Sequence, residues 1–265
     1  MRPGTAGDPA SSGLDPAPGP DPLSADHHTH TDHSDGRDPL ARMIAAAELR
    51  GLTTLYVTDH VRADTTYLPE YVAAVRAARG RTPLDIVCGV EAKIMDSSGR
   101  LDLPADLRGI EHIAIADHRY PLPDGPAHPD EVRAALGAGR LDRRTAVDLL
   151  VEATVHAVSD VPEGIGAHLA HLFSVLPKAG LDETDVPQEF IKRIADACLA
   201  TGTAVELNEK WRCPAPRTAA VLYRAGVRLV AGSDAHRHED VGAWSYVPQA
   251  LAAAGAPLGE TKEPG

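Results

Sequence analysis

The chain alternates short apolar runs with amphipathic helical patterns, and this alternation constrains its fold more than any other feature. Seven runs of strand length lie near residues 25–28, 53–58, 85–91, 112–117, 164–168, 203–207 and 227–233. Helical spacing of apolar residues recurs between them, near 38–51, 67–79, 143–158, 185–202 and 214–224. Strands that alternate with helices usually pair in parallel, and seven of them can close a barrel. The sequence therefore predicts an α/β fold with a seven-stranded (β/α)7 parallel barrel over residues 24–250.

The two ends of the chain differ from this pattern. Residues 1–22 hold six prolines and four glycines and have almost no apolar side chains to bury. Such a composition is typical of a segment that stays disordered. We expect a disordered tail over residues 1–23 and a short C-terminal tail over residues 251–265.

Composition narrows the class of partner. The formal net charge is -12, and no run of Lys or Arg could follow a phosphate backbone, so we do not expect a long nucleic acid as a partner. The three cysteines, Cys88, Cys198 and Cys213, are widely spaced and form no CxxC pair, which indicates reduced thiols and a cytoplasmic protein. No apolar stretch is long enough to span a membrane. The composition therefore favours a small molecule as the substrate. It does not indicate an oligomeric state.

Polar side chains follow the predicted strands at their carboxyl ends. In a parallel barrel these ends meet on one face, which is where such folds build their sites. Packing gains nothing from unpaired charge there, so the convergence of imidazoles and carboxylates predicts a cluster of divalent metal ions. The side chains at the seven ends are His28 and His30, His60, Glu91, His118, His168, Glu206 and Asn208, and Asp234 and His236.

The first of these ends carries the strongest local signal. His28 and His30 are two residues apart on a strand and point the same way, so they can bind one ion together. A single histidine at a strand end is more often a hydrogen-bonded core or rim residue. We assign His112, His128, His156 and His238 to that class.

Five short motifs, in order, resemble those of the PHP (polymerase and histidinol phosphatase) superfamily. "DHHTHTDHSDG" is similar to its opening D-x-H-x-H-T-x-x-S-D-G pattern, and "VTDH", "GVE", "ELN" and "SDAH" are similar to its later motifs. The resemblance covers roughly residues 24–245. It implies a distorted seven-stranded barrel that holds two or three divalent ions, of zinc, manganese or iron, and hydrolyses phosphoesters.

The resemblance also implies a set of ligands. Glu91 would be the bridging carboxylate, and Glu91, Asp234 and His236 would be the catalytic residues. His33 is a weaker candidate for the place of Asp35. The fifth strand offers both His168 and His171, and we prefer His168 because it directly ends the apolar run. The implied metal ligands are His28, His30, Asp35, His60, Glu91, His118, His168, Asp234 and His236.

The charge balance of such a centre suits phosphoester chemistry. Three divalent ions, three carboxylates and a bridging hydroxide would leave about +2 in a site of low dielectric, which complements a phosphate dianion. The metal-bridging hydroxide would be the nucleophile. Lys93, Arg119 and Arg212 are candidates for binding the phosphate oxygens.

The predicted function is that of a hydrolase acting on a small phosphomonoester, like histidinol phosphatase. A phosphodiesterase or exonuclease acting on nucleotides or oligonucleotides remains the alternative. A metal-stabilised module without catalysis is a third possibility, and the full ligand set argues against it.

Overall fold

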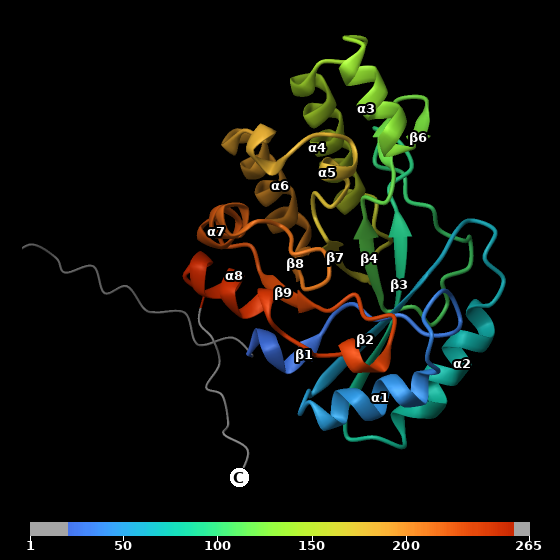
Figure 1. Cartoon of the computed structure of the whole chain (residues 1–265). Helices are drawn as coiled ribbons and strands as arrows, with labels where there is room; N and C mark the ends of the chain where they lie inside the picture. The colour runs from blue at the N-terminus through green and yellow to red at the C-terminus, as the bar shows by residue number, and fades with distance from the viewer. Residues whose placement is uncertain (1–20, 257–265) are drawn as a thin grey trace, which may run out of the picture.

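The computed structural model describes residues 21–256 and contains one seven-stranded parallel sheet (Figure 1). Its neighbours follow the order β1-β2-β3-β4-β7-β8-β9, and every pair is parallel. This confirms the predicted fold class and all seven predicted strands. The strands are β1 (Ala25–Asp26), β2 (Thr54–His60), β3 (Asp85–Lys93), β4 (His112–Ala116), β7 (Gly166–Ala170), β8 (Ala204–Asn208) and β9 (Leu229–Gly232).

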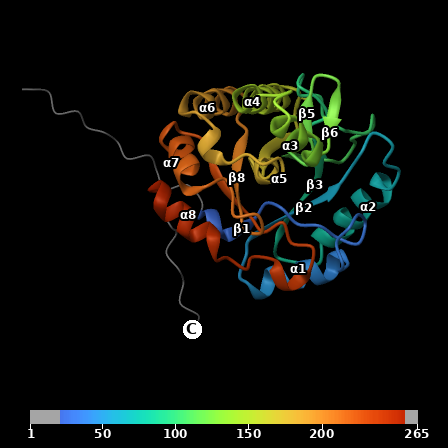
Figure 2. The same cartoon turned by 45° about the horizontal axis from the view of Figure 1, so that its top comes forward.

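Helices connect the successive strands of the sheet except β3 and β4, and they surround the sheet, as Figure 2 shows. All five predicted helical regions are present. The α-helices are α1 (Leu40–Leu49), α2 (Leu68–Arg79), α3 (Pro129–Gly137), α4 (Arg143–Ser159), α5 (Val175–Lys178), α6 (Gln188–Thr201), α7 (Pro216–Arg224) and α8 (Tyr246–Ala254). Short 3-10 turns are η1 (Pro22–Ser24), η2 (Glu183–Asp185) and η3 (His238–Asp240).

Some elements were not predicted from the sequence. An antiparallel hairpin, β5 (Tyr120–Leu122) and β6 (Gly125–Ala127), follows β4, and helices α3, α5 and α8 were also missed. Each hairpin strand has three residues, one of them proline, which is too short to show a period. Helix α8 continues past residue 250 to Ala254, and residues 257–265 of the predicted C-terminal tail lie outside the described residues. Residues 1–20 of the predicted N-terminal tail lie outside the described residues.

The barrel is brought close to closure where β1 meets β9. The backbone N–H of His27 donates to the carbonyl of Ala231 at 2.9 Å, and the N–H of Asp234 donates to the carbonyl of His28 at 2.9 Å. A further parallel bridge joins Thr29 to Ala235. The first and last strand ends, which carry much of the predicted site, are therefore held side by side.

Small residues leave space for imidazoles in the barrel. Ala114, Ala116 and Ala170 form a small buried apolar cluster, separate from the large core between the sheet and the helices. Ala114 pairs with His168 across β4 and β7. Since an alanine occupies little volume, this part of the interior can accommodate histidine rings.

The described residues contain no helix that is both long and apolar enough to cross a membrane. All three cysteines are free and buried, as expected for reduced thiols.

Asp26 fixes the junction between β1 and the segment after β9. Its fully buried carboxylate accepts the N–H of Ser233 at 2.9 Å, of Gly242 at 3.1 Å and of His28 at 3.2 Å. Replacing Asp26 by Ala would leave three buried donors without this acceptor, so we expect the free energy of unfolding to fall by about 2–4 kcal/mol. Urea unfolding of the metal-free protein measures this, with exposed Asp124→Ala as the control. Equal stability of the two variants would show that Asp26 does not hold the junction.

Candidate metal centre and substrate pocket

Glu91 is the central side chain of the site. It lies near the carboxyl end of β3, and its side chain is 1% exposed. Its Oε1 atom lies 3.0 Å from Nε2 of His118 and 2.9 Å from Nε2 of His171. Its Oε2 atom lies 2.9 Å from Nδ1 of His60. The two oxygens therefore face different groups of imidazoles, as a bridging carboxylate would.

The two histidines after β1 face the same carboxylate. Nε2 of His28 and Nε2 of His30 lie 3.4 Å and 3.5 Å from Oε2 of Glu91, and both rings are fully buried. The close spacing follows from their positions two residues apart on extended backbone. Both histidines therefore join β1 to the Glu91 cluster.

Asp35 lies at the exposed rim of the cluster. Its carboxylate lies 3.3 Å from Nε2 of His60, 3.3 Å from Nε2 of His236 and 3.8 Å from Nδ1 of His30. His33, the alternative in the same loop, instead contacts the hydroxyl of Thr31 at 3.1 Å. The structure thus brings Asp35 to the cluster and leaves His33 beside it.

Asp234 completes the cluster from the end of β9. Its Oδ1 atom lies 3.6 Å from Nε2 of His30 and 3.3 Å from Nδ1 of His236, and it accepts a hydrogen bond from Nζ of Lys210 at 3.0 Å. Oδ2 accepts from the indole N–H of Trp211 at 2.8 Å. The backbone of Asp234 has a φ of 54°, in the left-handed region that few side chains adopt. Such strain is common where a side chain must be aimed at a functional centre.

The donor atoms are arranged as metal ligands are. Four groups in the barrel each bring their donors within 4.8 Å of one another: His28, His30 and Asp234; His60, Glu91 and His118; His30, Asp35, His60 and His236; and His28, His168 and Glu206. Nε2 of His28, both ring nitrogens of His30 and Oε2 of Glu91 are buried without a hydrogen-bond partner among the described residues. Buried polar atoms are rarely left unpaired. Their convergence on one place is therefore accounted for by divalent cations, and the donor set fits them.

The fifth strand places its two histidines at different depths. We predicted the strand at 164–168, but β7 spans Gly166–Ala170, so His171 and not His168 directly follows its end. Nδ1 of His171 lies 3.1 Å from Oδ1 of Asp117, which orients the ring so that Nε2 faces Glu91. This carboxylate–histidine arrangement is the one that usually supports a metal-binding imidazole.

His168 belongs to a deeper layer below the cluster. Its Nδ1 lies 2.8 Å from Nε2 of His112, and its Nε2 has no hydrogen-bond partner among the described residues. Glu206 lies in the same layer, 3.1 Å from Nδ1 of His28 and 2.6 Å from the backbone N–H of His171, which donates to it. Gly232 makes room for Glu206, since a Cβ there would lie 1.7 Å from Oε1 of Glu206. Glu206 therefore orients His28 from below.

Burial and charge set the protonation of these groups. Burial holds the pKa of His30 well below its usual range, which keeps the imidazole in the neutral form that binds metals. Burial alone would raise the pKa of Glu91, but the imidazoles of His118 and His28 outweigh it and hold that pKa well below normal. Burial opposes protonation of His171, yet Asp117 and Glu91 raise its pKa to about 10. Without cations, the carboxylates therefore draw a proton onto His171.

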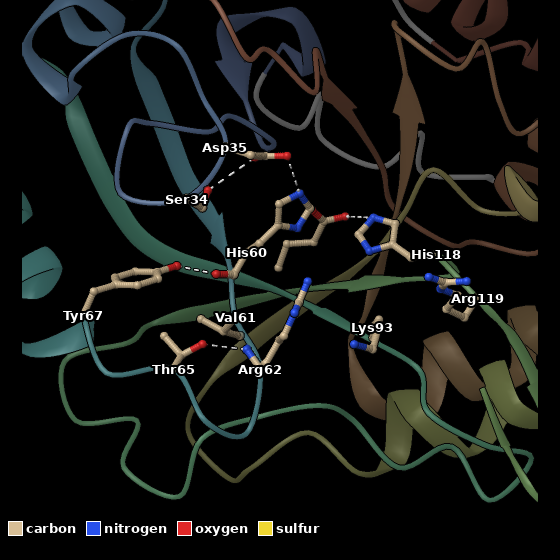
Figure 3. Close-up of a pocket in the computed structure, with 11 residues that line it drawn as sticks. Ser34, Asp35, His60, Val61, Arg62, Thr65, Tyr67, Lys93, His118 and Arg119 are labelled. Atoms are coloured by element: carbon tan, nitrogen blue, oxygen red, sulfur yellow. Dashed lines mark hydrogen bonds and ion pairs between the residues drawn. The ribbon is translucent and has the colours of Figure 1, made fainter. Parts of the chain in front are cut away.

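A pocket of about 570 Å³ opens beside the cluster (Figure 3). Nζ of Lys93 enters it and pairs with Oδ2 of Asp102 at 2.7 Å. Arg212 does not line this pocket, and its guanidinium lies 5.2 Å from the ring centroid of Tyr246. Sequence reasoning missed Arg62, although its position two residues after His60 was a usable signal. The lining residues are Ser34, Asp35, His60, Val61, Arg62, Thr65, Tyr67, Glu91, Lys93, His118 and Arg119.

Comparison with solved structures finds proteins that share this fold. The chain is similar to the histidinol phosphate phosphatase of Lactococcus lactis, which was crystallised with zinc, L-histidinol and phosphate. The two structures align with a TM-score of 0.61 and 17% sequence identity, over 88% of this chain and 94% of that one. A Listeria monocytogenes protein described as a candidate histidinol phosphatase gives a TM-score of 0.63, 15% identity and coverage of 82% and 97%. At these identities the likeness shows a shared fold.

Sequence comparison identifies the family. A Caldicellulosiruptor bescii protein named a probable phosphatase is 28% identical over 123 residues, which cover 44% of this chain and 50% of that protein. The match thus spans about half the length of this curated relative. Residues 26–210, more than half of the chain, match the PHP domain. The chain therefore belongs to the PHP domain family.

Proposed function

We propose that this protein is a metal-dependent phosphatase that hydrolyses a small phosphomonoester. The observation that carries the proposal is the set of buried, unpartnered donor atoms around Glu91, next to a pocket lined by cations. Family membership and the phosphatase names of its relatives support the same class of reaction. The neighbour crystallised with zinc supports a divalent metal, which in this chain would be zinc, manganese or iron.

The proposed ligand set departs from the sequence-based one at a single position. His171 takes the place of His168, because its Nε2 lies 2.9 Å from Glu91 and its Nδ1 is oriented by Asp117. His168 contacts His112 instead. The proposed ligands are His28, His30, Asp35, His60, Glu91, His118, His171, Asp234 and His236, for two or three ions; His171 is included for its contact with Glu91, and the others belong to the groups of converging donors.

The chain's own groups would prepare the substrate in defined ways. When bound, the divalent ions would supply Lewis acidity and lower the pKa of a coordinated water. Glu91, Asp234 and His236 would hold the ions at which the phosphate reacts, since each belongs to a group of converging donors. Lys93 lies two residues after Glu91 on the same side of β3, and its pairing with Asp102 positions Nζ for a phosphate oxygen. Lys210 adds positive charge on the side of the centre where Asp234 and His236 lie. Its Nζ is 3.0 Å from Oδ1 of Asp234 and 3.2 Å from Nδ1 of His236.

The competing function is that of a phosphodiesterase or exonuclease. A long polyanion would meet a chain of net charge -12, whereas a compact monoester needs only the pocket. We therefore expect the monoester to be preferred, with a weak dependence on salt.

Hydrolysis by the metal-free protein, reloaded with Zn, Mn or Fe, tests the proposal, with phosphate release measured for the monoesters and nucleotide release measured for the diesters. The panel contains histidinol phosphate and other small monoesters, a dinucleotide and single-stranded DNA. We expect kcat/KM to be highest for a monoester. A higher kcat/KM for single-stranded DNA, falling steeply as salt rises, would contradict the proposal and favour the nuclease.

A further inference from the structure

We propose that the substrate of this pocket is a phosphomonoester whose leaving group carries a second anionic group, a carboxylate or another phosphate, bound by Arg62 and Arg119. This inference rests on the proposed phosphatase function and adds the class of leaving group. It follows from how positive and negative side chains are distributed along the pocket wall.

The carboxylates and the cations of the pocket occupy different parts of it. The two carboxylates in the lining are Asp35 and Glu91, and both face the histidines of the metal centre. Neither is therefore free to bind a cationic leaving group. The lining also contains Arg62, Lys93 and Arg119. Away from the metal centre, the charge that a leaving group would meet is positive.

The three cations differ in their surroundings. Lys93 is paired with Asp102 at 2.7 Å, and its side chain is 21% exposed, close to Glu91 along β3. The guanidinium groups of Arg62 and Arg119 make no ion pair with any described residue, and both residues are exposed. In Figure 3, Arg62 points toward the edge formed by His60 and His118, and Arg119 lies beyond His118. Two cations without an ion pair to a described residue therefore border the pocket, one on each side of Lys93 and His118.

The backbone that carries Arg62 is well anchored. Its N–H donates to the hydroxyl of Thr65 at 2.8 Å, and the next N–H, of Ala63, donates to Oδ1 of Asp102 at 2.8 Å. Asp102 is the same carboxylate that pairs with Lys93. Asp102 therefore connects the loop after β2 to the end of β3, and this holds the backbone of Arg62 in place near Lys93.

Arg119 is anchored on both sides. Nε2 of His118, immediately before it, lies 3.0 Å from Glu91. The hydroxyl of the buried Tyr120, immediately after it, donates to the carbonyl of Ala146 at 2.7 Å. Because its neighbours are fixed, only the arginine side chain itself must be ordered when an anion binds.

The charge pattern sets the order of substrates. A guanidinium binds a carboxylate or phosphate through charge-assisted, often bidentate hydrogen bonds, and it repels an ammonium group. A leaving group with a protonated amine, such as that of histidinol phosphate, would find no free carboxylate among the lining residues. Monoesters should therefore rank as anionic, then neutral, then cationic leaving groups.

A series of three-carbon monoesters tests this ranking with the metal-loaded protein. Propyl phosphate has a neutral leaving group, 3-phosphonooxypropanoate an anionic one, 1,3-propanediol bisphosphate a second phosphate, and 3-aminopropyl phosphate a cationic one. We expect kcat/KM for the better of the two anionic esters to exceed that for propyl phosphate by about tenfold to a hundredfold. The aminopropyl ester should be the poorest. The two anionic arms distinguish carboxylate from phosphate recognition.

Variants identify which residues are responsible. In Arg62→Ala and Arg119→Ala, the ratio of kcat/KM for the anionic ester to kcat/KM for the neutral ester should fall at least about fivefold. In Arg62→Glu, the ratio of kcat/KM for 3-aminopropyl phosphate to kcat/KM for propyl phosphate should rise. Arg140→Ala, which removes an exposed arginine outside the pocket, should keep the wild-type ratio. The melting temperature of each variant serves as the folding control.

The outcomes separate this inference from the phosphatase proposal. If kcat/KM for the anionic ester and kcat/KM for propyl phosphate fall by the same factor in Arg62→Ala and Arg119→Ala, the arginines bind the reacting phosphate and the inference is wrong. It is also wrong if propyl or aminopropyl phosphate is the best substrate of the wild type. If the wild type releases phosphate from no monoester with any of the three metals, it is the phosphatase proposal that fails.

Discussion

Replacing Glu91 by Gln is expected to lower kcat/KM by about a thousandfold or more, the range seen when a preorganised charge-stabilising group is lost from an active site. Glu91 is the side chain whose two oxygens face separate groups of imidazoles, at 2.9 Å and 3.0 Å on Oε1 and 2.9 Å on Oε2. An amide keeps the shape of the side chain but removes the negative charge and one acceptor. Bound metal per chain should fall together with phosphate release.

The matched control for Glu91→Gln is Glu70→Gln, which makes the same chemical change on the exposed face of α2. Its activity and metal content should equal those of the wild type. If Glu91→Gln kept more than about a tenth of the wild-type kcat/KM with full metal content, Glu91 would not be the bridge between the ions.

The second large effect is expected at the fifth strand, where two histidines can be compared directly. His171→Gln should lower kcat/KM and metal affinity by about a hundredfold, because Nε2 of His171 faces Glu91 and Nδ1 is held by Asp117. His168→Gln should reduce activity less than about tenfold. Its main effect should be a loss of about 1–3 kcal/mol in the free energy of unfolding, since it breaks the buried contact with His112.

Each of these two variants is the control for the other, because the substitution is the same and both rings are buried. Metal titration followed by calorimetry, and urea unfolding of the metal-free proteins, give the two readouts. A larger loss of metal affinity in His168→Gln than in His171→Gln would contradict the proposed ligand set.

The strands of the barrel were predictable because each is a short apolar run that ends at a polar group. The alternation with helices then determined that the polar ends share one face. Most candidate residues, among them His28, His60 and Glu91, do lie together for this reason. The convergence depends on the order and direction of the strands, both of which a sequence pattern can show.

The choice between His168 and His171 was not predictable by the same reasoning. Strand boundaries read from apolar runs are uncertain by a few residues, and here a shift of two residues moved the strand end. The chain then turns sharply, with φ of 33° at His171 and 72° at Phe173, so the alternation of side chains along a strand no longer applies. The partner of His171, Asp117, comes from the end of a different strand.

Loop contacts were the least predictable feature. Asp38 precedes Pro39 and has the sequence of a helix cap, yet the cap of α1 is Pro39. The carboxylate of Asp38 instead accepts hydrogen bonds from Arg42 and from the backbone N–H of His238, which is far away in the sequence. For the same reason Arg62 enters the pocket and Arg212 does not, because loop geometry depends on long-range contacts.

The central claim is that Glu91 bridges divalent ions held by histidines from several strands. Anomalous diffraction at the zinc absorption edge, from crystals of the zinc-loaded protein, tests it most directly. We predict at least two zinc peaks, one on each side of the Glu91 carboxylate, with Nε2 of His171 bound to one of them and His168 bound to none. Peaks that do not involve Glu91, or no peak at all in crystals of the fully loaded protein, would contradict the claim.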